Sequence, residues 1–160
     1  MVAATVLSLA AAGDAAALAR RLEPLAAERL GDPAATVSVL ELLLEKPGPA
    51  DGEAAPFHYV VETDADDANL AELNEWYQQE HLPGLAAVPG TVRARRYLRT
   101  QGKPRFVACY DLVTPAAMEH PAWLAVRHTE WSSRVRPMFR NTFRTLYTRI
   151  ESQPFRSAQR

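Results

Sequence analysis

Hydrophobic and polar residues follow two different periods along this chain, and these periods predict where its strands and helices lie. Four stretches have the alternation, or the β-branched and aromatic content, that is typical of strands. They are residues 57–62, 91–99, 105–113 and 141–150. A helical period separates the first strand from the second, and another separates the third from the fourth. The order β-α-β-β-α-β predicts an α+β fold with a ferredoxin-like unit, in which two helices cover one face of a four-stranded antiparallel sheet.

The first part of the chain predicts a further β-α-β segment. A short apolar run at residues 3–11 favours a strand, and residues 15–30 consist mainly of strong helix formers followed by Gly31. Residues 36–44 alternate and then become continuously apolar, which is typical of a buried strand. A linker rich in Pro and Gly follows. We therefore expect an N-terminal βαβ extension or degenerate half-repeat (1–48), the ferredoxin-like unit (57–150) and a tail (151–160).

The helix predicted within residues 69–90 carries polar side chains on the side that should face the core. At about 100° per residue, one sector of this helix contains Leu70, Leu73, Asn74, Tyr77 and His81. An amide, a phenol and an imidazole are costly to bury unless they have partners. Pro83 then ends the helix or bends it into a short further turn. The polar groups on the inward side make this helix the first place to look for chemistry.

Composition and charge limit the partners that the chain can have. The apolar fraction is 48%, the charged fraction is 23% and the formal net charge is -1, so no general attraction for nucleic acid or an anionic membrane is expected. No segment approaches the length of a membrane span. The single cysteine, Cys109, excludes an internal disulfide framework, and its apolar surroundings predict a buried, inert thiol. We expect a cytoplasmic protein with no nucleic-acid partner and no membrane partner.

Three segments contain a combination of residues that is more specific than any of its parts. They read NEWYQQEHLPGLAAVPGTVRARRYL, RFVACYDL and HPAWLAVRHTEWSSRVRPMFRNTFRTLYTRI. The first contains the pattern W-Y-x-x-E-H-x-P at residues 76–83, followed by a V-P-G turn. Together these segments resemble the EthD-like family of the dimeric α+β barrel superfamily, over residues 57–150. The residues before 57 lie outside the resemblance.

The resemblance implies a ferredoxin-like protomer that pairs with a second copy through its sheet, as a homodimer, with a cavity between the sheet and the helices. Members of the wider superfamily include polyketide cyclases and decarboxylases, small-lactone isomerases and haem-handling monooxygenases. Many EthD-like members have no assigned activity. The fold alone therefore does not choose a reaction.

His81 and Tyr77 are one helical turn apart, so their side chains can share a hydrogen bond or a pocket. An imidazole in a pocket is suited to removing a proton alpha to a carbonyl, and Tyr77 or Asn74 can donate to the developing enolate oxygen. The candidate catalytic residues are therefore His81, Tyr77 and Asn74. The alternative is structural, with His81 capping the helix end or bonding a backbone carbonyl beside Pro83.

The candidate ligand-binding residues are Trp76, Arg95, Trp123 and Tyr147. The aromatic members either pack in the core or line a cavity for an aromatic substrate. Arg95 and Arg96 lie on opposite faces of their strand, so at most one points into a barrel, where it holds a carboxylate or phenolate. The alternative is a surface ion pair. The histidines show no close pair at metal-ligand spacing, so we expect no metal site and no cofactor, with axial ligation of haem by one histidine left open.

These observations leave three functions open. The first is a cofactor-independent lyase, isomerase or cyclase that acts on a small hydrophobic or aromatic carbonyl compound with His81 as its acid–base. The second is a non-catalytic dimeric module that binds a small molecule or serves in assembly. The third is a haem-handling monooxygenase.

Overall fold

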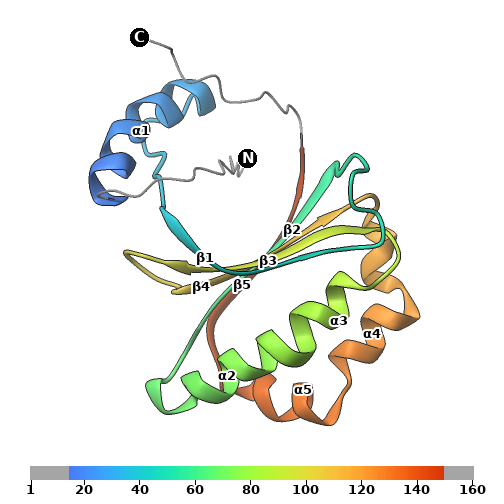
Figure 1. Ribbon diagram of the computed structural model, residues 1–160. Helices are drawn as coiled ribbons and strands as arrows, with labels where there is room; N and C mark the ends of the chain where they lie inside the picture. The colour runs from blue at the N-terminus through green and yellow to red at the C-terminus, as the bar shows by residue number, and fades with distance from the viewer. Residues whose placement is uncertain (1–14, 150–160) are drawn as a thin grey trace.

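The computed structural model describes residues 15–149, and its central element is an antiparallel sheet (Figure 1). The five strands of this sheet are β1 (Leu40–Pro47), β2 (Phe57–Ala65), β3 (Thr91–Arg99), β4 (Phe106–Leu112) and β5 (Phe139–Thr148). They lie in the order β1-β3-β4-β2-β5, and each strand is antiparallel to its neighbours.

Strands β2 to β5 have the topology of a ferredoxin-like unit. Within the sheet they lie in the order β3-β4-β2-β5, so the two strands that lead into helical connections, β2 and β4, are the inner ones. The connecting helices are α2 (Leu70–Trp76), α3 (Leu82–Ala86), α4 (Pro121–Arg127) and α5 (Glu130–Val135). All four cover the same face of the sheet (Figure 1). The predicted α+β fold class is therefore confirmed.

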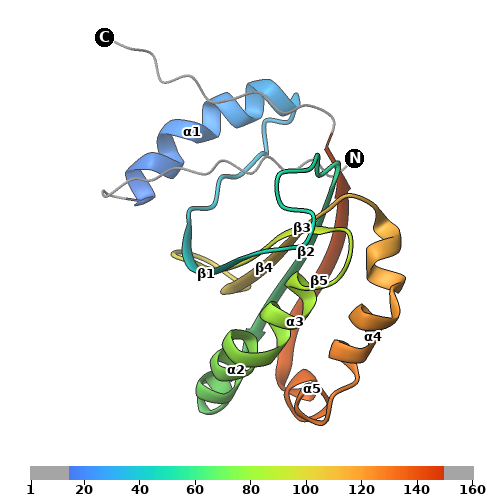
Figure 2. The ribbon, with the colours of Figure 1, turned by 45° about the vertical axis from the view of Figure 1, so that its right-hand side comes forward.

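The N-terminal segment adds a helix and an edge strand to this unit. Helix α1 (Ala15–Leu30) has the predicted bounds and is followed by Gly31 at a φ of 62°, the left-handed conformation that glycine adopts most easily. It stands on the opposite side of the sheet from α2–α5, as two views agree (Figure 1, Figure 2). Strand β1 pairs with β3 and extends the sheet. The strand predicted at residues 3–11 and the tail at 151–160 lie outside the described residues.

Residues 36–44 were predicted to form a buried strand, and this is wrong because the strand found there is largely exposed. Strand β1 begins at Leu40 and lies at the edge of the sheet, where Leu42 and Leu43 are 52% and 43% exposed. A register shift interrupts its pairing with β3 between Leu42 and Leu44. An edge strand has a neighbour on one side only, so a continuous apolar run does not by itself bury it. Leu44 alone in this run packs against the main core.

The main core lies between the sheet and helices α2–α5. On the first of these helices, Leu73 and Trp76 are fully buried, and the following Tyr77 is 2% exposed. Asn74 is exposed, so the prediction that it faces the core is wrong. The indole of Trp76 has far more apolar surface to bury than the amide of Asn74. The helix is therefore rotated so that Trp76 faces the core and Asn74 faces solvent.

The helical segment between β2 and β3 changes its hydrogen-bond pattern halfway along. Helix α2 is followed by a π turn at Tyr77–His81, in which the N–H of Leu82 donates to the carbonyl of Tyr77, five residues earlier. Helix α3 then continues past Pro83, which lies in its first turn. The second of the two predicted outcomes, a short further turn after the proline, is the one observed. Interruptions of this kind inside α-helices often occur at functional sites.

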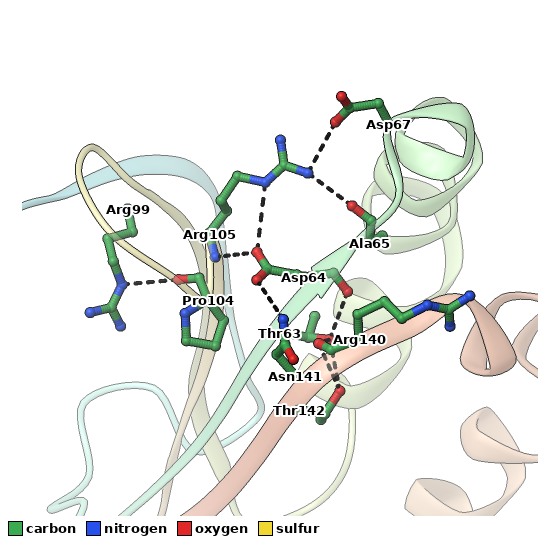
Figure 3. Close-up of polar contacts among 10 residues, drawn as sticks. All are labelled: Thr63, Asp64, Ala65, Asp67, Arg99, Pro104, Arg105, Arg140, Asn141 and Thr142. Carbon is green, nitrogen blue, oxygen red and sulfur yellow. Dashed lines mark hydrogen bonds and ion pairs between the residues drawn. The ribbon is translucent and has the colours of Figure 1, made fainter.

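A polar cluster fixes the end of β2 before the chain enters α2 (Figure 3). The carboxylate of Asp64 accepts a hydrogen bond from the backbone N–H of Arg105 at 2.7 Å and one from Asn141 at 3.3 Å. Arg105 also donates to the carbonyl of Ala65. Asp66, which precedes the next short helix, makes no side-chain capping bond. Asp64 instead joins β2 to the start of β4 and to β5.

Candidate active site

A small cavity lies between the sheet and the helices, beside the π turn. Its volume is about 40 Å³, which is room for about three water molecules. The aromatic residues of its wall are Tyr59, Trp76, Tyr77, Tyr110, Trp123 and Phe139. The polar and charged residues of the wall are His81, Arg127, Arg136 and Arg144. An apolar, aromatic interior with a few converging polar groups is the usual character of a small-molecule site.

The imidazole of His81 is held among aromatic rings at the wall of this cavity. It stacks on the indole of Trp76, with ring centroids 4.0 Å apart and planes inclined by 21°. The ring of Tyr77 approaches it edge-on, at 5.4 Å between centroids. Its Nδ1 is buried and has no hydrogen-bond partner among the described residues. One form of the structural alternative is a bond from His81 to a backbone carbonyl beside Pro83, and Nδ1 does not make that bond.

Burial and charge set the protonation states of the two polar groups. Burial, and after it the positive charges of Arg127 and Arg136, lower the pKa of His81 to about 3, so the imidazole is neutral at pH 7. Burial raises the pKa of Tyr77 to about 12, against the opposing effect of Arg96. The phenol therefore keeps its proton at neutral pH and is able to donate a hydrogen bond.

Glu80 fixes the position of Trp76 and joins two helical connections. Its Oε1 accepts hydrogen bonds from Nε1 of Trp76 at 3.1 Å and from the hydroxyl of Thr129 at 2.6 Å. Nε1 of Trp76 also lies 3.3 Å from the hydroxyl of the buried Ser132. Since Trp76 stacks on His81, this network holds the imidazole in place through the indole. The sequence pattern places Glu80 in the W-Y-x-x-E-H-x-P motif but gives no sign of this role.

Asn74 lies outside the cavity and acts on it only through Arg96. Its side-chain oxygen accepts a hydrogen bond from Arg96 at 2.8 Å, and the guanidinium of Arg96 lies 4.2 Å from the centroid of the Tyr77 ring. Arg96 is 4% exposed. Of the two adjacent arginines, Arg96 is thus the one that points toward the helices, and Arg95 points to the other face.

The opposite face of the sheet carries a second polar cluster, which the sequence analysis did not find. Nδ1 of His58 lies 2.6 Å from Oδ1 of Asp111, and Arg95 binds the other carboxylate oxygen. Arg149 lies 3.7 Å from Oδ1. Tyr147 is paired with His58 across β2 and β5 and so belongs to this face. No sequence signal joins His58, Arg95 and Asp111, because they come from three different strands.

The cavity brings together four of the seven candidate residues, namely Trp76, Tyr77, His81 and Trp123. The remaining three do not line it: Asn74 is exposed, and Arg95 and Tyr147 lie on the other face. The sequence analysis did not single out the three arginines of the cavity wall. They come from the end of α4, the turn after α5 and β5, so no local pattern joins them.

Metal sites, membrane spans and reactive thiols are other features on which function can depend. Among residues 15–149, no group of three or more His, Cys, Asp or Glu side chains is placed to hold a metal ion. Within the same range, no helix has both the length and the apolar character needed to cross a membrane. Cys109 is buried, as predicted, and burial raises the pKa of its thiol to about 12, so it is a poor nucleophile.

Comparisons with known proteins give a likeness in fold. No protein-family model matches the sequence, and no curated protein matches it significantly. The structure of a major regulator of staphylococcal pathogenesis is similar at 10% identity and a TM-score of 0.49, covering 71% of this chain and 69% of that one. A mutant form of SnoaB, a cofactor-independent oxygenase from Streptomyces nogalater, is similar at 19% identity and a TM-score of 0.47, covering 64% of this chain and 100% of its own. Both scores are below 0.5, so neither similarity bears on activity.

Proposed function

We propose that this chain is an EthD-like enzyme that isomerises, cyclises or cleaves a small hydrophobic or aromatic carbonyl compound without a cofactor, with His81 as its acid–base. One observation carries the proposal: His81 lines an aromatic cavity with a buried nitrogen that has no partner among the described residues. A buried polar atom without a partner is costly, and a ligand that bonds to it removes that cost.

In the proposed step, the imidazole of His81 accepts the proton from the carbon next to the substrate carbonyl. The electron pair of the broken C–H bond forms the C=C bond of an enolate, and negative charge moves to the carbonyl oxygen. Tyr77, protonated at neutral pH, donates a hydrogen bond to that oxygen. Where a C=C bond adjoins the alpha carbon, the negative charge extends over it, and return of the proton from His81 to the far carbon of that bond completes an isomerisation with no oxidant or reductant. Asn74 supports this arrangement indirectly, by holding Arg96 over the Tyr77 ring.

The size of the cavity adds a requirement to the proposal. At about 40 Å³ it is much smaller than ordinary ligand pockets of about 300–1,000 Å³. An aromatic carbonyl compound therefore enters only if part of the wall moves outward.

Deuterium exchange tests the chemistry without knowledge of the natural substrate. In D₂O, the protein is expected to speed exchange of the hydrogens alpha to the carbonyl in small aryl ketones, as measured by proton NMR. His81→Gln and Tyr77→Phe should lower this rate, by about 10²–10⁴-fold for the base. The matched controls are His128→Gln and Tyr97→Phe, which change the same residue types outside the cavity. Equal rates in His81→Gln and His128→Gln would contradict the assignment.

The second candidate, a non-catalytic small-molecule-binding or assembly module, is favoured by the small cavity and by the low pKa of His81. A base with a pKa of about 3 holds a proton weakly, so catalysis requires that the substrate raise its proton affinity. If the chain is a non-catalytic module, aryl ketones bind or fail to bind, but their deuterium exchange is no faster than the uncatalysed exchange in D₂O. Haem does not fit the cavity as described, because its macrocycle is far larger than about 40 Å³.

The proposal also includes the assembly and location expected from the sequence. The face of the sheet opposite α2–α5 carries exposed apolar side chains, of which Phe143 on β5 is 58% exposed and Leu42 on β1 is 52% exposed. A second copy packed on this face would cover them, which supports a homodimer. We place this dimer in the cytoplasm, on the cysteine content and charge of the chain.

A further inference from the structure

Three arginines of the cavity wall have no carboxylate partner. Arg127 ends α4, Arg136 follows α5, and Arg144 lies within β5. Among the described residues none of the three forms an ion pair, and the cavity wall contains no Asp or Glu. Arg136 donates to the backbone carbonyl of Arg127 at 3.3 Å, which brings the first two together. The positive charge around the cavity is therefore uncompensated by the described part of the protein.

The other arginines of this part of the chain behave differently. Between residues 93 and 149, each of them apart from Arg96 pairs with a carboxylate, as Arg134 does with Glu72 and Glu130. Arg96 is buried, bonded to Asn74 and stacked on Tyr77. The lack of a carboxylate is thus a property of the arginines at the cavity and not of the whole basic segment.

The three arginines differ in burial in a way that orients a ligand. Arg127 is half-buried, whereas Arg136 and Arg144 are exposed, so their guanidinium groups mark the side of the cavity toward solvent. The opposite wall is formed by buried aromatic rings, including those of Trp76 and Trp123. A ligand that satisfies both parts has an aromatic ring inside and an anionic group outside.

We infer that the substrate is an aromatic keto acid, whose carboxylate binds Arg127 and Arg136 while its ring enters between Trp76 and Trp123. This inference rests on the proposed function, because it names the substrate of the same site. A planar carboxylate suits arginine, which can bind it through two parallel N–H groups. The keto group then lies between the carboxylate and the ring, inside a cavity whose wall includes His81.

Binding of such an anion also resolves the weakness of His81 as a base. Burial is the largest cause of its lowered pKa, and Arg127 and Arg136 are the next two. A carboxylate between these arginines neutralises their effect and so raises the proton affinity of the imidazole when substrate is present. The same two residues therefore recognise the substrate and prepare the base.

A matched pair of probes tests the inference. Phenylpyruvate carries the carboxylate, and phenylacetone has a methyl group in its place. Binding is measured by the change in tryptophan fluorescence, since two tryptophans line the cavity. Phenylpyruvate is expected to bind about 10- to 100-fold more tightly. Arg127→Met with Arg136→Met should abolish this preference, and the control Arg134→Met, on the neighbouring helix, should keep it.

The outcomes separate the inference from the proposed function. Equal affinities for the two probes would contradict the inference that the substrate is a keto acid. A preference that survives Arg127→Met with Arg136→Met would contradict it too, and so would the absence of arginine-dependent binding. If binding depends on the arginines but no deuterium exchange occurs, the keto acid remains the ligand and the proposed enzymatic activity is contradicted. If the double variant does not fold, as thermal unfolding would show, salt gives the second measurement. Raising the salt concentration should weaken binding of phenylpyruvate and leave phenylacetone unchanged.

Discussion

His58 donates a hydrogen bond from Nδ1 to Oδ1 of Asp111, 2.6 Å away, across the pair of strands β2 and β4. Both side chains are buried, and Arg95 binds the second carboxylate oxygen. Burial by itself raises the pKa of Asp111, but the hydrogen bond from His58 and the charge of Arg95 outweigh it, and the pKa lies below its ordinary value. Asp111 is therefore an ionised acceptor at neutral pH, and Nδ1 of His58 carries the proton.

Asp111→Asn should lower the free energy of unfolding by about 3–5 kcal/mol at pH 7, because it leaves the guanidinium of Arg95 and the Nδ1–H of His58 without their anionic acceptor. Urea denaturation measures the loss. The pKa of Asp111 is depressed in the folded state, so its contribution is present above the ordinary pKa of aspartate and disappears as pH falls through the lowered value. The control Asp51→Asn removes an exposed pair with Arg93 and should cost less than about 1 kcal/mol. Equal losses in the two variants would contradict this account.

His81 should make the protein less stable in mild acid. Its pKa is about 3 in the folded state and about 6.5 when unfolded, so the unfolded state binds more protons between these values. Stability due to neutral His81 is complete above pH 6.5 and falls by about 1.4 kcal/mol per pH unit as pH decreases toward 3. Wild type and His81→Asn are compared by urea denaturation across this range. The variant should lose less stability on acidification, and parallel curves would show that the histidine titrates normally.

Gly84 sets the distance between α3 and α4. A Cβ atom at this position would lie 2.8 Å from Cγ2 of Val126, closer than real side chains approach. Gly84→Ala should therefore destabilise the protein by about 1–3 kcal/mol, although alanine is the better helix former. Adding Val126→Ala should recover most of this loss, so the two changes together should cost less than their sum. Thermal unfolding of the four proteins tests the coupling, and simple additivity would rule out the contact.

Asn141 has a φ of 48° and donates to Asp64 at 3.3 Å, so two effects are combined at one position (Figure 3). Asn141→Gly removes only the hydrogen bond, since glycine accepts this backbone conformation. Asn141→Ala removes the bond and also strains the backbone, at a further cost of about 1–2 kcal/mol. Chemical denaturation should therefore rank wild type above the glycine variant and the glycine variant above the alanine variant. Equal stability of the two variants would remove the backbone contribution.

Phe143→Glu should convert the proposed homodimer into a monomer, because Phe143 is 58% exposed on the face of the sheet opposite α2–α5. A carboxylate in place of this phenyl ring is costly to bury against a second copy. Light scattering coupled to size-exclusion chromatography gives the mass. Leu124→Glu is the control, since Leu124 is 39% exposed on α4 and lies on the other side of the molecule. A wild-type monomer, or a dimer unaffected by Phe143→Glu, would contradict the proposed interface.

The sequence predicted local structure better than it predicted orientation. The βαββαβ order and the bounds of α1 follow from residues next to each other in the chain. The helix starts at Pro115 and Pro121 are also local, since the side chains of Thr114 and His120 accept hydrogen bonds from backbone N–H groups two residues later. Such signals are local, so they are visible without the fold.

The face to which a side chain points could be determined only from the tertiary structure. Alternation along β3 shows that Arg95 and Arg96 point to opposite faces, but only the packing of the helices decides that Arg96 is the inner one. Asn74 was misplaced because a helical projection weights all inward residues alike, whereas the bulk of Trp76 decides the rotation. The pair of His58 and Asp111 joins residues 53 positions apart and has no local signal.

The π turn at Tyr77–His81 has a consequence for how related chains should be aligned. It encloses one residue more than an α-helical turn, so the residues after it are rotated by about 100° from where an uninterrupted helix would place them. The count of residues between Trp76 and Leu82 therefore determines which side chain faces the cavity. A related chain with other residues in this turn, but the same number of them, presents the same position to the cavity. A related chain with one residue fewer presents a different position, even if it retains the histidine.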